Sequence, residues 1–310
     1  MVDISTQISR VKLSNPTVLA SGFLGVSGAS LASVARNGAG AVTTKSIGLE
    51  ARKGHPCPVV LTLEDGIINA VGLSGPGINE KIAEVEYAKK NCNAAVIASI
   101  FASTQKEFGI VAKEVSKAKP DLIEVNISCP NVQSEFGLPF GTDPKIAAAV
   151  TRQVKKNTKI PVIVKLTPNV TDIGEIAVSV AKAGADAINA INAVGPGMVI
   201  NPEAKKPVLS NKRGGVSGTA IKPIAVRCVY DIHESLEEAK KLIPIIGTGG
   251  VTTGRDAVEM FMAGACSVGI GTAIYSRGIE VFKRVGIEII EFMKKEGYNS
   301  IEEMRALAHK

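Results

Sequence analysis

The stretch Pro244–Thr272, PIIGTGGVTTGRDAVEMFMAGACSVGIGT, contains the pattern that decides the fold. Its two apolar runs, PIIGTGG and CSVGIGT, have the length of buried strands, and glycine follows the apolar residues in each. Between them, TTGRDAVEMFMAGA repeats its apolar residues at helical spacing. A strand, a helix and another strand in this order predict a parallel pair, because parallel strands need a crossover connection.

The same unit recurs along all 310 residues. Six further strand-like runs precede this stretch: PTVLAS, GAVTTKS, NAAVIASI, DLIEVNIS, PVIVKLT and DAINAIN. Helix-period stretches separate many of them, at residues 79–91, 143–157 and 171–185. Eight such units predict a closed (β/α)8 TIM barrel, although an open doubly wound sheet with a second domain would show much of the same alternation.

Polar residues at the ends of these runs favour the barrel. They are Lys45, Ser99, Asn126, Lys165, Asn192, Gly249 with Gly250, and Gly271 with Thr272. In a barrel the carboxyl ends of all strands meet at one face, where the active site lies. We therefore predict one domain over residues 1–310. The long connections at 47–78 and 193–218 are expected to form lids or pocket walls on that face.

Composition excludes several classes of protein. The formal charge of +7 is spread along the chain, and aromatic residues make up only 4%, which argues against a nucleic-acid surface. The five cysteines form no CxxC pair, so neither a disulfide framework nor a metal site is indicated. The sequence contains no apolar run long enough to span a membrane. We expect a cytoplasmic protein that binds a phosphorylated cofactor or an anionic metabolite.

The segment VNISCPNV places Cys129 just after a predicted strand, beside Asn, Ser and Pro. A free cysteine is often only a small buried hydrophobe, and this alternative stays open. A nucleophilic cysteine normally needs a nearby histidine, and His55, His233 and His309 do not end a predicted barrel strand. Of the functional roles, a proton-transfer base therefore suits Cys129 better.

The glycines that end the last two strands favour phosphate binding, because glycine lets backbone N–H groups approach the oxygens. The alternative is ordinary turn chemistry. Lys45 and Lys165 each end an apolar strand, which suggests a flavin ring or a carboxylate as ligand, unless both side chains simply extend to solvent. The loop NAVGLSGPG (69–77), with Asn126 and Asn192, supplies amides suited to a cyclic amide or ureide, although Asn is also common in turns.

With these residues assembled, the chain resembles the class 1 dihydroorotate dehydrogenases, and most closely the class 1B catalytic subunits. The matching stretches are NPTVLASG, TTKSI, NAVGLSGPG, EVNISCPNV, IVKLTPNV, GGVSGTAIKP, IIGTGGV, GIGTA and GYNSIEEMRALAH. They cover nearly the whole chain in the family's order.

The resemblance implies one FMN across the barrel mouth and dihydroorotate stacked on it. The implied FMN contacts are Ser21, Lys45, Ser46, Ser99, Asn126, Lys165, Ile191, Gly218, Gly249, Gly250, Gly271 and Thr272. The implied substrate contacts are Lys45, Asn69, Ala70, Val71, Gly72, Leu73, Asn126, Asn192 and Ala193. Cys129 would take a proton from C5 of the substrate while hydride leaves C6 for flavin N5, and Lys165 would stabilise the reduced flavin.

The resemblance also implies a partner. Class 1B enzymes pass electrons to NAD through a separate subunit carrying FAD and [2Fe-2S], in a homodimer or a heterotetramer with two chains of each kind. Two positions depart from the family pattern: Ser99 stands where asparagine is usual, and Ala193 where a hydroxyl residue is frequent.

The alternatives that remain are an FMN-dependent reductase of dihydrouracil or dihydrothymine, and a fumarate-using class 1A-like enzyme. A flavin-free phosphate-binding lyase or isomerase and a catalytically silent FMN-binding subunit would also fit parts of the pattern.

Overall fold

The computed structural model describes residues 2–127 and 140–310, and eight of its strands form a closed parallel barrel. They are β3 (Thr17–Leu19), β4 (Ala41–Thr43), β7 (Ala95–Ile100), β8 (Leu122–Asn126), β9 (Val162–Leu166), β10 (Ala187–Ala190), β15 (Ile245–Thr248) and β16 (Ser267–Ile270). Neighbours in the barrel follow chain order, and β16 pairs with β3 to close it. Each strand lies within one of the runs expected from the sequence, so the predicted (β/α)8 class is confirmed.

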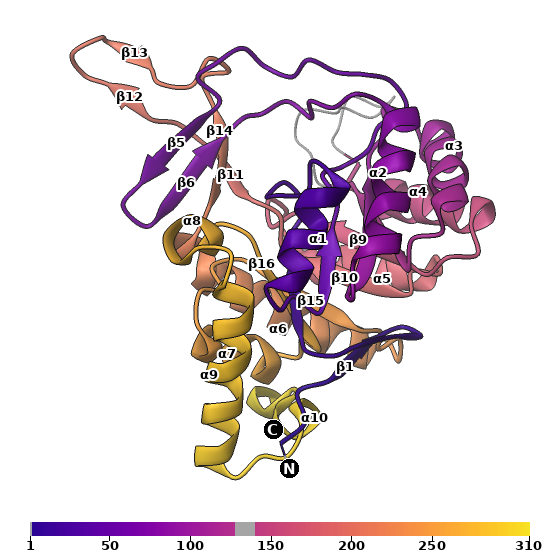
Figure 1. Ribbon diagram of the computed structural model, residues 1–310, viewed down its shortest axis with the longest axis vertical. Helices are drawn as coiled ribbons and strands as arrows, with labels where there is room; N and C mark the ends of the chain where they lie inside the picture. Colours follow the sequence, from indigo (N-terminus) through magenta and orange to yellow (C-terminus); the bar gives the residue numbers. More distant parts are fainter. Residues whose placement is uncertain (1, 128–139) are drawn as a thin grey trace.

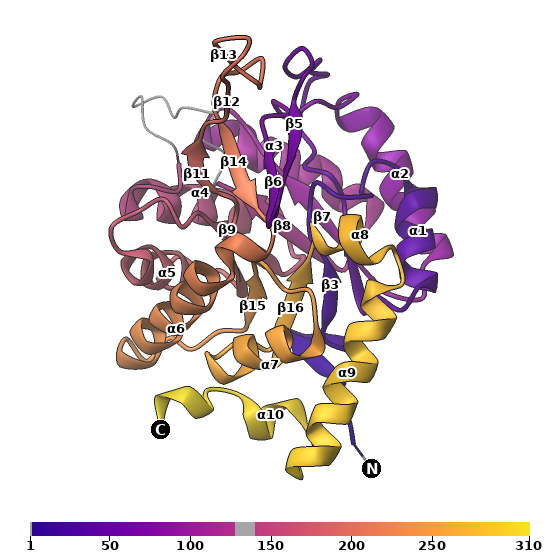
Figure 2. The same cartoon turned by 90° about the vertical axis from the view of Figure 1, so that its left-hand side faces the viewer.

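Helices surround the barrel (Figures 1 and 2). They are α1 (Gly28–Arg36), α2 (Ile78–Asn91), α3 (Gln105–Val115), α4 (Pro144–Asn157), α5 (Ile173–Lys182), α6 (Lys222–Glu238), α7 (Gly254–Met262) and α9 (Val281–Glu296). Short helical turns are η1 (Ser116–Ala118), η2 (Thr219–Ile221), α8 (Ala273–Arg277), α10 (Ile301–Met304) and η3 (Leu307–His309). Over the described part of the chain, no helix has both the length and the apolar character needed to cross a membrane.

Helix α7 shows how the sequence sets these boundaries. The hydroxyl of Thr253 accepts the backbone N–H of Asp256 at 3.2 Å, and the Asp256 carboxylate accepts the N–H of Thr253 at 2.8 Å. This reciprocal capping box satisfies N–H groups that the helix itself leaves unpaired. Lys222 at the start of α6 also contacts Asp256 at 2.7 Å, so the cap ties two neighbouring helices together.

An N-terminal hairpin closes one end of the barrel. Strands β1 (Thr6–Ile8) and β2 (Val11–Leu13) are antiparallel, and Ile8 and Leu13 are 0% and 2% exposed. They pack in one apolar cluster with the first inward-facing residues of the barrel strands, among them Ile97, Ile163 and Ile246. Both chain termini lie at this end (Figures 1 and 2). The opposite end, where the strands finish, is left for a site.

The two long connections form one additional sheet at that opposite end. Its strands are β5 (Val60–Leu63), β6 (Gly66–Asn69), β11 (Val194–Gly197) and β14 (Gly214–Ser217), in the order β11-β14-β6-β5. The central pair, β14 and β6, is antiparallel and joins residues about 150 positions apart in the sequence, such as Gly215 and Asn69. A small hairpin, β12 (Ile200–Asn201) and β13 (Lys206–Pro207), projects beyond it (Figure 1).

Candidate active site

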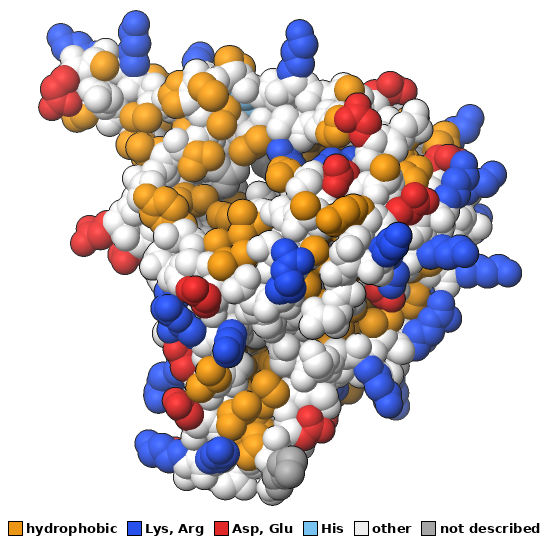
Figure 3. All heavy atoms as spheres, in the orientation of Figure 1, with side chains coloured by type: hydrophobic (Ala, Val, Ile, Leu, Met, Phe, Trp, Pro, Cys, Tyr) orange, Lys and Arg blue, Asp and Glu red, His pale blue; other side chains and the backbone are white. Residues whose placement is uncertain are grey.

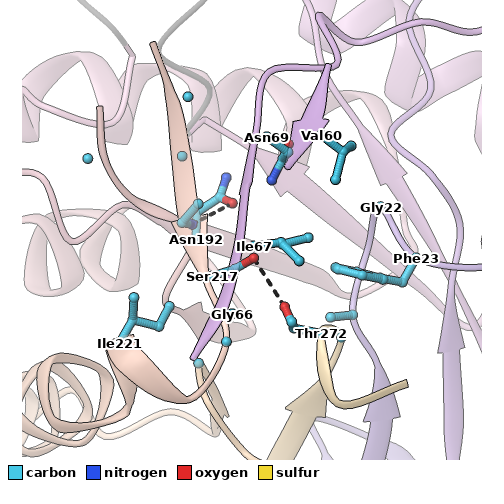
Figure 4. Close-up of a pocket in the computed structure, with 18 of the residues that line it drawn as sticks. Gly22, Phe23, Val60, Gly66, Ile67, Asn69, Asn192, Ser217, Ile221 and Thr272 are labelled. Carbon is cyan, nitrogen blue, oxygen red and sulfur yellow. Dashed lines mark hydrogen bonds between the residues drawn. The ribbon is translucent and has the colours of Figure 1, made fainter. Parts of the chain in front are cut away.

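A cavity of about 890 Å³ lies between the ends of the barrel strands and the additional sheet. The space-filling view shows the molecule hollowed beside the projecting β5 and β6, with apolar side chains around the opening (Figure 3). In the close-up, Ile67 and Phe23 point toward one another across this space, and the amides of Asn69 and Asn192 approach it from the sheet and from the barrel (Figure 4). Both long connections therefore contribute walls, as expected.

The cavity brings together nearly all the predicted binding residues. Those that line it are Ser21, Lys45, Ser46, Asn69, Ala70, Val71, Gly72, Leu73, Asn126, Lys165, Ile191, Asn192, Ala193, Gly218, Gly249, Gly250, Gly271 and Thr272. Cys129 lies outside the described residues, so its role as a base stays a prediction. Ser99 is fully buried and is not part of the wall.

Lys165 is the most informative residue of the site. Strand β9 places it between Asn126 on β8 and Asn189 on β10, and only 4% of it is exposed. Within the described residues it forms no hydrogen bond and no ion pair. The side chain is largely buried, and its ammonium has no protein acceptor in the described part of the chain, so it is free to bind a ligand in the cavity. Its position in the cavity wall therefore indicates an electron-rich ligand.

A second ammonium enters the cavity from the segment after β4. The ammonium of Lys45 donates to the hydroxyl of Ser74 at 2.8 Å. Burial lowers the pKa of Lys45, and the nearby Lys81 lowers it further. Lys81 is itself buried and donates to the carbonyl of Val26. Two cations held this close favour an anionic group beside Lys45, such as a carboxylate.

The glycines after β15 and β16 form a cradle of bare backbone. A Cβ on Gly249 would lie 2.6 Å from the Cβ of Ala225, and one on Gly250 would lie 2.6 Å from the Cβ of Lys222. Gly249 and Gly250 also have φ values of 134° and 73°, a region that favours glycine. In the described structure, the N–H groups of Gly250 and Gly271 donate to no protein acceptor. This donor set fits a phosphate group.

The two positions that depart from the family pattern differ in their surroundings. Ser99 lies beneath the wall, where it bonds Ser46 and Glu124, so its predicted direct contact with a cofactor is not supported by its burial. Ala193 lines the cavity, and its N–H donates to the Asn192 side chain at 2.9 Å. Its carbonyl accepts from the side chain of Asn169 at 3.3 Å, so Ala193 acts through its backbone.

Sequence reasoning missed several residues of the site. Asn169 also accepts the N–H of Gly195 at 2.9 Å and so holds the segment that follows β10. Ser217, at the end of β14, accepts a hydrogen bond from Thr272 at 3.1 Å, which ties the additional sheet to the end of β16 (Figure 4). Phe23 supplies an apolar wall. Of these residues, only Asn169 could have been predicted from the sequence, because it follows the β9 run closely in TPNV and so lies near the end of a barrel strand.

Comparisons with known proteins agree with this geometry. The family model described as dihydroorotate dehydrogenase matches residues 3–293. The chain is 48% identical to a protein of Methanosarcina mazei over 303 residues, which cover 97% of this chain and 94% of that one. It is 45% identical to a Methanocaldococcus jannaschii protein over 309 residues, with 99% and 98% coverage, and 44% identical to one of Pyrococcus abyssi over 300 residues, with 97% coverage of each. All three relatives are named dihydroorotate dehydrogenase B (NAD(+)), catalytic subunit.

Proposed function

Because the chain belongs to the dihydroorotate dehydrogenase family, we propose that it oxidises dihydroorotate to orotate in pyrimidine biosynthesis, with one FMN as its cofactor. The observation that carries this proposal is Lys165, a largely buried lysine that lines the cavity without a partner in the described residues. Family membership implies a flavin, and a flavin ring that gains electrons is a ligand that such an ammonium stabilises.

The residues present fit FMN. The cradle of Gly249, Gly250 and Gly271, with Thr272 beside it, would hold the phosphate, and Lys165 would contact the flavin ring. Ser21, Ser46, Asn126, Ile191 and Gly218, all on the cavity wall, would complete the contacts. When bound, FMN supplies the hydride acceptor that the amino-acid side chains lack.

The rest of the cavity suits dihydroorotate. Lys45 would bind the carboxylate, supported by the positive charge of Lys81 behind it. Amides of Asn69, Asn126 and Asn192 offer donors and acceptors for a ring that carries both N–H and C=O groups. The segment 70–73 would cover the ring, and Ala193 would add a backbone contact. Cys129 would remove the proton from C5.

We further infer a partner subunit that carries FAD and [2Fe-2S] and passes the electrons to NAD. The relatives are named catalytic subunits and NAD(+) enzymes, which supports a partner of this kind. This chain has five scattered cysteines rather than the grouped set that an iron–sulfur cluster requires, so the cluster belongs on the other subunit. A dimer of catalytic chains, alone or with two partner chains, in the cytoplasm completes the proposal.

The test is anaerobic mixing of the purified FMN-loaded protein with dihydroorotate while the visible flavin absorbance is followed. Wild type should bleach rapidly, and Cys129→Ala should bleach at least about a hundredfold more slowly, as expected for loss of a general base. A yellow protein that is bleached by dihydrouracil and not by dihydroorotate would transfer the proposal to the dihydropyrimidine reductases. A protein that takes up no FMN would refute the cofactor itself.

A further inference from the structure

A carboxylate lies inside the barrel below the cavity. Glu124 on β8 is 1% exposed and is two residues before Asn126, so both side chains face the barrel interior. Its oxygens accept from Ser99 Oγ at 2.9 Å and from Asn189 Nδ2 at 2.6 Å. Within the described residues it has no cationic partner. Both contacts therefore use the carboxyl group of Glu124 as a hydrogen-bond acceptor.

One chain of hydrogen bonds leads from the cavity wall to this carboxylate. Ser99 has a single hydroxyl hydrogen and donates it to Glu124, so in the 3.0 Å contact between Ser46 and Ser99 the donor must be Ser46. Ser46 in turn accepts from the amide of Asn126 at 3.1 Å. The neighbouring hydroxyls of Ser21 and Ser46, which then share no hydrogen, are farther apart at 3.4 Å.

A second chain arrives from the other side of the barrel. Thr248 at the end of β15 donates to Asn189 Oδ1 at 2.7 Å, and Asn189 donates to Glu124. The Thr248 side chain lies against Gly269 on the neighbouring strand β16, where an added Cβ would lie 1.9 Å from its hydroxyl oxygen. Both chains therefore run in the same sense, from the cavity wall toward the carboxylate.

We propose that Glu124 is a positioning residue that fixes the hydrogen-bond direction at the cavity floor and lowers the reduction potential of the bound flavin; this inference rests on the flavin cofactor of the proposed function. The hydroxyl hydrogens of Ser46 and Thr248 point away from the cavity, so both residues present lone pairs to the ligand. The buried negative charge acts in the same direction, since it opposes the uptake of electrons above it. Lys165, on the neighbouring strand β9, acts in the opposite direction.

The test is the midpoint potential of the flavin in the FMN-loaded protein, measured by equilibration with redox dyes. Glu124→Gln keeps the shape of the side chain and removes its charge. The new amide donates to Ser99, which turns the hydrogens of Ser99 and Ser46 toward the cavity. We expect the equilibrium to shift toward reduced flavin by about tenfold or more, a rise of about 30 mV for a two-electron couple.

Thr151→Val is the matched control. Thr151 is also fully buried and donates to the carbonyl of Ala147 at 2.8 Å, but it lies within α4, outside the cavity wall. Its variant should lose stability and leave the potential unchanged. If Glu124→Gln does not fold, Ser99→Ala tests the same chain, because Ser46 then regains a free hydrogen and the potential should rise by a smaller amount.

The outcomes separate the two proposals. If Glu124→Gln, or Ser99→Ala in its place, has the same flavin potential as wild type, the role of Glu124 is overturned and the proposed function is left intact. A wild type that binds FMN but is not bleached by dihydroorotate would overturn the substrate alone. A wild type that binds no FMN would overturn both.

Discussion

Replacing Lys165 with methionine should stabilise the protein without FMN and weaken its binding of FMN. Only 4% of Lys165 is exposed, and its ammonium has no partner in the described residues. An unsatisfied buried polar group costs about 1–3 kcal/mol, and methionine has a similar length without the charge. For a chain of this size, relief of that cost raises the melting temperature by about 2–5 °C.

The same substitution removes a charged contact to the flavin, which is worth about 1.5–3 kcal/mol, so FMN affinity should fall by about 10- to 100-fold. Thermal unfolding of the FMN-free protein and fluorescence titration with FMN measure the two effects. Lys81→Met is the control, because Lys81 is similarly buried but donates to the Val26 carbonyl. Its loss should lower the melting temperature of the FMN-free protein. The reasoning is refuted if Lys165→Met is not more stable than wild type, or if it binds FMN as tightly.

Three further outcomes are expected. Lys45→Ala should raise the KM for dihydroorotate at least tenfold in steady-state kinetics, since it removes the cation beside the carboxylate; an unchanged KM would contradict its role. Gly269→Ala should lower the free energy of unfolding in urea by more than about 1 kcal/mol, because the added methyl meets Thr248 at 1.9 Å. Burial lowers the pKa of His233 and nearby His309 lowers it further, so the unfolded chain takes up protons first as pH falls below about 6.5. Stability should therefore decline from pH 7 toward pH 5, and His233→Gln should flatten that decline.

Most of the fold was predictable because each element carries its own signal. Short apolar runs gave all eight barrel strands, and the helix expected at 143–157 begins at Pro144 with Asp143 as its cap. The additional sheet was not predictable. Its strands β6 and β14 are four residues each and pair across about 150 positions, so neither has a register until the barrel brings the two connections together.

Within the site, the sequence identified the residues at the strand ends that line the cavity. It did not identify the buried residues inside the barrel beneath them. Ser99 and Asn126 both looked like wall residues, but the barrel places Ser99 level with Glu124 and leaves Asn126 at the cavity. The signal for Glu124 was present: an acidic residue in the middle of the apolar run DLIEVNIS must face the interior if Asn126 does, because side chains alternate along a strand.

The interior of the barrel holds two opposite charges on neighbouring strands that do not pair with one another in the described structure. If these two charged residues served stability alone, Glu124 and Lys165 would form an ion pair or be replaced by apolar residues. Instead, neutral donors from Ser99 and Asn189 satisfy both oxygens of Glu124. An anion that is already satisfied competes weakly for the ammonium, which leaves Lys165 available to a ligand. The neutral donors Ser99 and Asn189 therefore explain how the buried carboxylate of Glu124 and the unpaired ammonium of Lys165 coexist at one cavity.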